Sequence, residues 1–123
     1  MILALSVALA GAIGAPARFT LDGWLQRRAQ TTVPVGTLAI NLSGALALGF
    51  VAGLLDSHHV SRTVETIVGT GFLGAFTTFS TFTFESIRLA EEAAWRALAV
   101  YLTGTLVCGL LAAGLGLWIA SFI

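Results

Sequence analysis

The most unusual stretch of the sequence, in chemical terms, is residues 69–84, GTGFLGAFTTFSTFTF. Phe76, Phe79 and Phe82 recur at every third position, so on a helix they form one stripe with hydroxyl side chains around it. The edges of aromatic rings carry partial positive charge, and hydroxyls donate hydrogen bonds. Such a stripe can solvate a small anion without a full countercharge, which would bind too tightly for the ion to leave. It can equally serve only as helix packing. The hydroxyls are those of Thr77, Thr78, Ser80, Thr81 and Thr83.

The same stretch predicts an interrupted helix. Gly69, Gly71 and Gly74 precede a run of threonine and phenylalanine, and all of these are poor helix formers. We expect the break near residues 74–78. In a membrane, non-helical backbone is tolerated only where protein buries it or where it lines an aqueous cavity. Carbonyls freed at such a break can coordinate a cation.

Two further polar residues lie within or beside apolar runs. A guanidinium such as that of Arg18 costs about 2.5–3.5 kcal/mol at mid-membrane, so it must reach the interface or a water-filled vestibule. In a vestibule it would attract anions toward a pore. Asn41 brings two amide donors to the middle of an apolar run, where unpaired donors are costly. Its amide is therefore either a bond between helices or an ion ligand.

These residues must be positioned by membrane-spanning helices. Hydrophobic residues make up 57% of the 123 residues and charged residues 10%, which is too apolar for a soluble domain. Four charge-free stretches each approach the roughly 20 residues that cross a bilayer, and they predict an all-α membrane protein with a single transmembrane domain. The stretches are Met1–Ala17, Val33–Leu55, Thr66–Phe84 and Ala97–Ile123, within expected helices 1–26, 33–55, 62–88 and 94–122.

The charged residues lie almost entirely in the short connections. With four spans, both termini share a side with the middle connection. That side carries only Arg62, and the other carries most of the remaining arginines, so the positive-inside rule places the termini outside. The arginines of the other side are Arg27, Arg28, Arg88 and Arg96.

Other classes of function have little support in the sequence. There is no Ser, His and Asp set, carboxylate pair or cysteine cluster, so we expect no enzyme. The net charge is zero and there is no lysine, which argues against nucleic acid as a partner. His58 and His59 are adjacent in a connection and lack the spacing of a zinc site.

Three motifs resemble one family, the Fluc (CrcB) fluoride channels. They are Gly11–Phe19 (GAIGAPARF), Gly36–Gly44 (GTLAINLSG) and Gly71–Phe82 (GFLGAFTTFSTF). The resemblance covers essentially the whole chain. It implies a channel in the bacterial inner membrane through which toxic fluoride leaves the cell passively.

The resemblance also implies an assembly and residue roles. The expected assembly is an antiparallel, dual-topology homodimer with two pores and a structural sodium ion at its centre, held by the carbonyls of Gly74 and Thr77. Arg18 is expected in the vestibule. The arginine bias is unusual for dual topology, so the partner could instead be a homologous chain of opposite orientation. The expected fluoride path comprises Asn41, Phe79, Ser80, Thr81, Phe82, Glu85, Tyr101 and Thr105.

Two alternatives stay open at this point. One is a small dimeric exporter of the multidrug-resistance type, which would need a membrane-embedded carboxylate in the first helix, and the first apolar run has none. The other is a membrane assembly subunit that transports nothing. In that case Asn41 and the hydroxyls of the third span would be packing contacts only.

Overall fold

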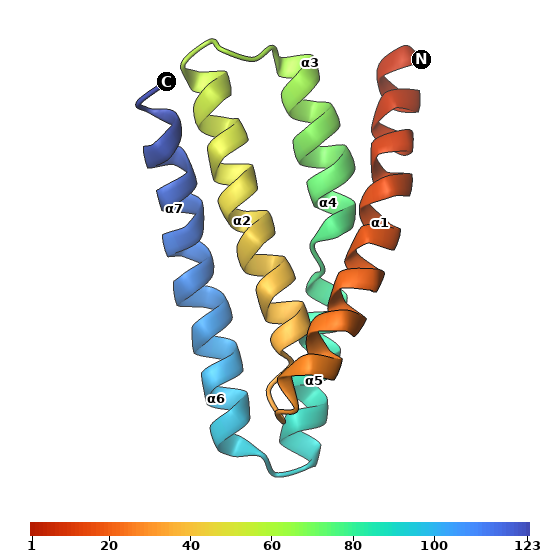
Figure 1. Cartoon of the computed structure of the whole chain (residues 1–123), viewed down its shortest axis with the longest axis vertical. Coiled ribbons are helices and arrows are strands. Elements are labelled where there is room, and N and C mark those ends of the chain that lie inside the picture. Colours follow the sequence, from red (N-terminus) through yellow and green to blue (C-terminus); the bar gives the residue numbers. More distant parts are fainter.

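A computed structural model describes all residues from 1 to 123, and every regular element in it is helical. Four rods run alternately down and up (Figure 1). The first two rods are α1 (Ile2–Ala29) and α2 (Val35–Asp56). Both are long and apolar enough to cross a membrane, and so are the third rod, Arg62–Glu91, and the fourth, Trp95–Ala120. The chain is therefore a multi-pass, all-helical membrane protein.

The third and fourth rods are each built from several segments. The fourth is continuous and contains one π-helical stretch, whereas the third is interrupted between α4 and α5 (Figure 1). The third rod consists of α3 (Arg62–Glu65), η1 (Thr66–Leu73, π-helical), α4 (Gly74–Phe76) and α5 (Phe79–Glu91). The fourth consists of α6 (Trp95–Thr103), η2 (Gly104–Cys108, π-helical) and α7 (Gly109–Ala120).

The helices approach one another closely where small residues face a neighbouring backbone. A methyl group added at Gly49 of α2 would meet the carbonyl of Ala113 on α7, and one at Gly116 would meet the carbonyl of Leu46. At Gly14 of α1 it would meet the carbonyl of Phe72 on η1. Such close approach replaces the hydrophobic driving force that is missing between helices in lipid. The structure thus assigns packing roles to Gly14, Gly49 and Gly116.

The first helix continues well beyond its apolar run. The expected helix ends at residue 26, whereas the structure continues it to Ala29, and Asp22 lies against the first turn of α2. The side chain of Asp22 fills the space that a Cβ atom at Gly36 would occupy, and the amide oxygen of Gln26 accepts a hydrogen bond from the Gly36 N–H (3.3 Å). These polar contacts to α2 explain why the helix does not stop where its apolar residues do. Asp22 nevertheless lies near the helix end rather than at mid-span.

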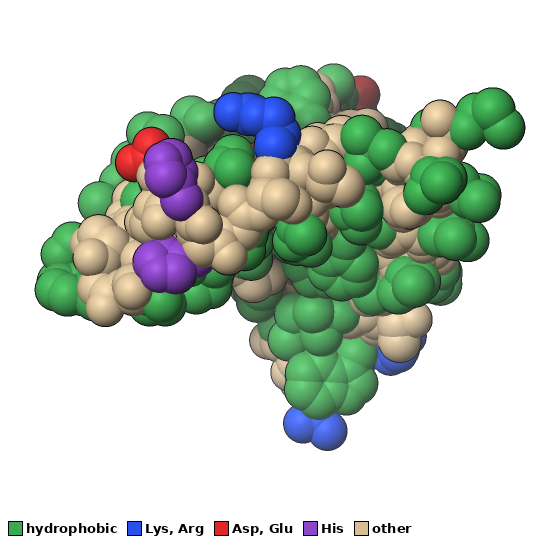
Figure 2. Space-filling model, turned by 90° about the horizontal axis from the view of Figure 1, so that it is seen from above, with side chains coloured by type: hydrophobic (Ala, Val, Ile, Leu, Met, Phe, Trp, Pro, Cys, Tyr) green, Lys and Arg blue, Asp and Glu red, His purple; other side chains and the backbone are tan.

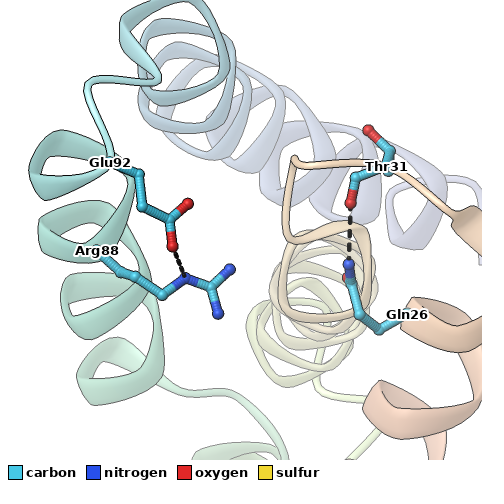
Figure 3. Close-up of polar contacts among 4 residues, drawn as sticks. All are labelled: Gln26, Thr31, Arg88 and Glu92. Atoms are coloured by element: carbon cyan, nitrogen blue, oxygen red, sulfur yellow. Dashed lines mark hydrogen bonds and ion pairs between the residues drawn. The ribbon is translucent and has the colours of Figure 1, made fainter.

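The end of the molecule opposite the termini carries Arg27, Arg28, Arg88 and Arg96. Figure 3 shows two contacts there: the Arg88–Glu92 ion pair (3.6 Å) and a hydrogen bond from the Gln26 amide to the Thr31 carbonyl (3.4 Å). The Arg28 guanidinium also lies 4.3 Å from the centre of the Trp24 ring. This end therefore has the basic and aromatic character of a membrane interface.

Most of the surface is apolar. Only 15 of the 123 residues are buried within the single chain, so its hydrophobic side chains mostly face outward. Seen from the end that carries the termini, hydrophobic side chains cover much of the visible face, and the two exposed histidines lie near an acidic side chain (Figure 2). Lipid or another protein chain must cover a surface of this kind.

Candidate functional site

The functional site is built around the interruption of the third rod. The helix ends at Phe76, and Thr77 (φ −79°, ψ 163°) and Thr78 (φ −148°, ψ 120°) are extended before α5 begins at Phe79. The break therefore falls within the segment 74–78 that the sequence predicts. Glycine and β-branched threonine lower the cost of leaving the helical conformation here.

Asn41 of α2 pairs with the extended backbone at the break. Its amide nitrogen donates to the carbonyl of Thr78 (3.0 Å), and its amide oxygen accepts from the N–H of Thr78 (2.9 Å). Both backbone groups of Thr78 are thereby satisfied by one side chain, as a neighbouring strand would satisfy them. The sequence left two roles open for Asn41, and the structure shows a bond between helices. One amide hydrogen is left over, because the nitrogen carries two.

The hydroxyl of Thr78 begins α5. It accepts a hydrogen bond from the N–H of Thr81 (3.1 Å), which is the N-cap arrangement. The same hydroxyl donates to the Thr81 hydroxyl (2.9 Å) and lies 3.3 Å from the Ser80 hydroxyl. Ser80 and Thr81, both predicted on the ion path, are thus joined to the break through Thr78.

Backbone groups of both signs are unpaired at the break. The N–H groups that would bond the carbonyls of Gly74 and Thr77 in a continuous helix are used elsewhere: that of Thr78 bonds Asn41, and that of Thr81 bonds the Thr78 hydroxyl. No other hydrogen bond reaches the carbonyl of Thr77. Phe79 and Ser80 are the first two residues of α5, where N–H groups have no acceptor within their own helix. The end of one helix therefore presents partial negative charge within a few residues of partial positive charge at the start of the next.

A groove of about 380 Å³ opens beside the break. It brings together six residues that the sequence assigns to the two ion sites, and no charged side chain lines it. Thr78 and Gly44 also line it, although neither belongs to the expected fluoride path or sodium site. Phe79 is 80% exposed, so this groove is open to the outside of the single chain. The six residues are Asn41, Gly74, Thr77, Phe79, Phe82 and Thr105.

A row of side chains leads from the groove toward the α5–α6 connection. The ring centre of Phe82 lies 5.9 Å from that of Phe79 and 5.3 Å from that of Tyr101. The Tyr101 hydroxyl donates to the carboxylate of Glu85 (2.7 Å), and Tyr101 is fully buried. Glu85 and Tyr101 do not line the groove itself, but they continue it.

Three buried polar atoms have no hydrogen-bond partner within the chain: Nε of Arg18 and the hydroxyl oxygens of Thr37 and Thr105. Of these, only Thr105 lines the groove. Arg18 lies apart from the groove lining, so the structure does not join it to the other predicted site residues. Thr37 lies in the quoted motif Gly36–Gly44 but gives no other sequence signal, because a single threonine in an apolar helix is common.

The comparison with known families decides the assignment. The family described as CrcB-like protein, Camphor Resistance (CrcB), matches residues 5–117, which is nearly the whole chain. The chain belongs to this CrcB-like family. The multidrug-exporter and assembly-subunit alternatives are therefore not needed to account for its sequence.

Several curated members of the CrcB-like family are similar over almost their full length. The fluoride-specific ion channel FluC 1 of Leifsonia xyli subsp. xyli is 45% identical over 120 residues, which cover 98% of this chain and 88% of that protein. The fluoride-specific ion channel FluC of Nitratidesulfovibrio vulgaris is 47% identical over 110 residues (89% of each chain). The fluoride-specific ion channel FluC 2 of Bacillus thuringiensis subsp. konkukian is 42% identical over 117 residues (95% and 96%).

Proposed function

We propose that this chain forms a fluoride-selective channel through which fluoride leaves the cell passively, down its electrochemical gradient. The observation that carries the proposal is the groove at the break, where Asn41, Phe79, Phe82 and Thr105 meet without any charged neighbour. The names of the similar CrcB-like proteins support fluoride as the ion.

The groove has the chemistry that fluoride transfer requires. Fluoride is the smallest halide and holds its water most tightly, so a path that admits it must replace that water with many weak donors. Ring edges at Phe79 and Phe82, the unpartnered hydroxyl of Thr105 and the free N–H groups at the start of α5 are donors of this kind. With no full positive charge among them, an ion that enters can also leave.

The remaining polar residues extend this path. Ser80 and Thr81 supply hydroxyls beside the groove, and the Tyr101–Glu85 pair continues it along the ring of Phe82. Arg18 lies farther off, and its fixed positive charge would draw anions toward the mouth of the path. We assign the fluoride path to these residues together with the groove lining.

A sodium ion fits the opposite side of the break. Sodium binds oxygen ligands. Gly74 and Thr77 line the groove, and the N–H groups that would bond their carbonyls in a continuous helix are used elsewhere. When bound, the ion would offset the partial negative charge of these carbonyl oxygens and so stabilise the interrupted backbone. Two carbonyls are too few to surround a cation, whereas a second chain related by a two-fold axis would double them.

We therefore propose an antiparallel dimer, either of two copies of this chain or of this chain with a homologous chain of opposite orientation. The second possibility is supported by the four arginines at one end of the molecule, which favour a single orientation.

The proposed transport is tested with purified protein in liposomes loaded with potassium fluoride or potassium chloride. Adding valinomycin dissipates the membrane potential, and an ion-selective electrode records the released halide. We expect rapid fluoride efflux and chloride efflux no faster than from protein-free liposomes. Fluoride efflux that requires an imposed pH gradient would point to a coupled exporter, and an absence of efflux would contradict the proposal.

The proposed dual topology is tested in intact cells with a cysteine placed in a C-terminal tag on a Cys108→Ala background. A membrane-impermeant thiol reagent should label about half of the tags if both orientations are equally populated. Cells that express only this chain and export fluoride with every tag on one side would contradict the homodimer. Labelling on one side without export would instead support the need for a second, homologous chain.

A further inference from the structure

We propose that Asn41 is a positioning residue: its amide holds the Thr78 peptide in the extended conformation, and it affects fluoride passage through Thr78 rather than as the ion's direct ligand. This inference rests on the proposed channel function. It concerns how the break in the third rod is held in place, and that question does not depend on which ion is transported.

The geometry of the pair carries the proposal. Both polar atoms of the Asn41 amide are engaged by a single residue 37 positions away, at 3.0 Å and 2.9 Å. Thr78 lies between two helices and has no other partner for its N–H or its carbonyl. In a membrane, two unpaired backbone groups are costly, and no neighbouring strand is present to bind them. The asparagine amide, which resembles a peptide group, takes the place of that strand.

A second contact from α2 restrains the break at the preceding residue. Gly44 lies one turn after Asn41 and faces the γ2 methyl group of Thr77 so closely that a Cβ atom would collide with it. Thr77 is also fixed by its own hydroxyl, which donates to the carbonyl of Leu73 (2.9 Å). Consecutive residues of the break are thus held by two positions on one face of α2.

Thr78 connects this restraint to the proposed fluoride path. Its hydroxyl caps α5 and bonds the Thr81 hydroxyl, and the next residue in the chain is Phe79. If the Thr78 peptide rotated, the cap would be lost and the first turn of α5 would move, carrying Phe79 and Phe82 with it. The orientation of the ring edges therefore depends on the amide of Asn41.

The first test measures the backbone directly. Asn41→Leu keeps the side-chain size and removes both hydrogen bonds. Hydrogen–deuterium exchange of the purified protein should show the Thr78 amide exchanging about tenfold faster, the loss expected for one well-formed hydrogen bond. Ser43→Ala is the matched control, because the Ser43 hydroxyl bonds only the carbonyl of Ile40 within α2. An unchanged exchange rate in Asn41→Leu would overturn the inference.

The second test separates positioning from direct contact with the ion. Replacing the Thr78 amide by an ester removes its N–H and leaves the Asn41 side chain in place. We expect fluoride efflux about tenfold below the parent. Adding Asn41→Leu should then cause a smaller loss than it causes in the parent, because the bond from the Thr78 N–H is already absent and only the bond to the Thr78 carbonyl remains to be lost. Parent-like efflux from the ester variant, or multiplicative losses in the double variant, would show that Asn41 acts on the ion itself.

The exchange measurement does not depend on the proposed function. If the parent protein releases no fluoride, the channel assignment fails, while the exchange measurement still decides whether Asn41 holds Thr78. If Asn41→Leu does not fold, the ester variant, which keeps every natural side chain, decides the question through amide exchange at Thr81, whose N–H bonds the Thr78 hydroxyl (3.1 Å). Faster exchange there supports the inference, and parent-like exchange overturns it.

Discussion

Replacing Phe82 with isoleucine should lower fluoride efflux by about tenfold or more while the chain remains folded. Isoleucine preserves the bulk and the hydrophobicity of the site but has no ring edge to offer an anion. Phe82 lies between Phe79 and Tyr101, with ring centres 5.9 Å and 5.3 Å away, so its loss interrupts the row of rings at its middle. Phe79→Ile should also lower fluoride efflux, because it removes the ring at the end of the row that lies in the groove. Efflux from liposomes, measured beside size-exclusion profiles, tests both.

A suitable control for these variants is Cys108→Ala. Cys108 is exposed on the fourth rod and does not line the groove, so this substitution should leave efflux unchanged. If Phe79→Ile and Phe82→Ile both conducted as well as the parent, the phenylalanine stripe would be packing only, and the proposed path would have to lie elsewhere.

Replacing Gly44 with alanine should reduce efflux by a similar factor, for a steric reason. The added methyl group would collide with the γ2 methyl of Thr77. Thr77 cannot rotate that methyl away without losing the bond from its hydroxyl to Leu73 (2.9 Å), so the break itself must shift. Overpacking of this kind typically costs about 1–3 kcal/mol. If this cost raises the barrier to fluoride passage, the efflux rate should fall by roughly tenfold. Thermal unfolding of the purified variant, measured with its efflux, shows how the cost is divided.

Gly114→Ala is the control for Gly44→Ala. Gly114 also lies within a helix, but a methyl group there has no neighbouring atom within 4 Å. Alanine is the better helix former, so this variant should be as stable as the parent or slightly more stable. Parent-like efflux from Gly44→Ala would mean that close contact between α2 and Thr77 is not required for the break.

Several features of the fold were predictable because the membrane imposes strict rules. Lipid requires long apolar helices, so the four spans could be identified from the absence of charge alone. The break was predictable because Gly74 and the threonines after it conflict with helix formation in a segment that must otherwise be helical. The contacts of Asp22 and Gln26 with α2 were not predictable, because they join residues far apart in the chain.

The candidate site was predictable in part. The sequence selected Phe79, Phe82 and Asn41 because their chemistry is unusual at membrane depth, and the structure places all three on one groove. It did not distinguish Thr78 from the other hydroxyl residues around the phenylalanine stripe, which have the same local surroundings. What distinguishes Thr78 is a pair of hydrogen bonds to a side chain 37 residues away, and no local pattern reports such a contact.

The sequence by itself thus determined the class of the protein, its spans and the position of its weakest helix, because these depend on composition and on local backbone preference. The tertiary structure alone decided which polar groups are satisfied and which stay free. Asn41 pairs with Thr78, while the carbonyl of Thr77 has no partner. Hydrogen bonding depends on distance and direction between groups far apart in the chain, and only the packing of α2 against the third rod fixes those.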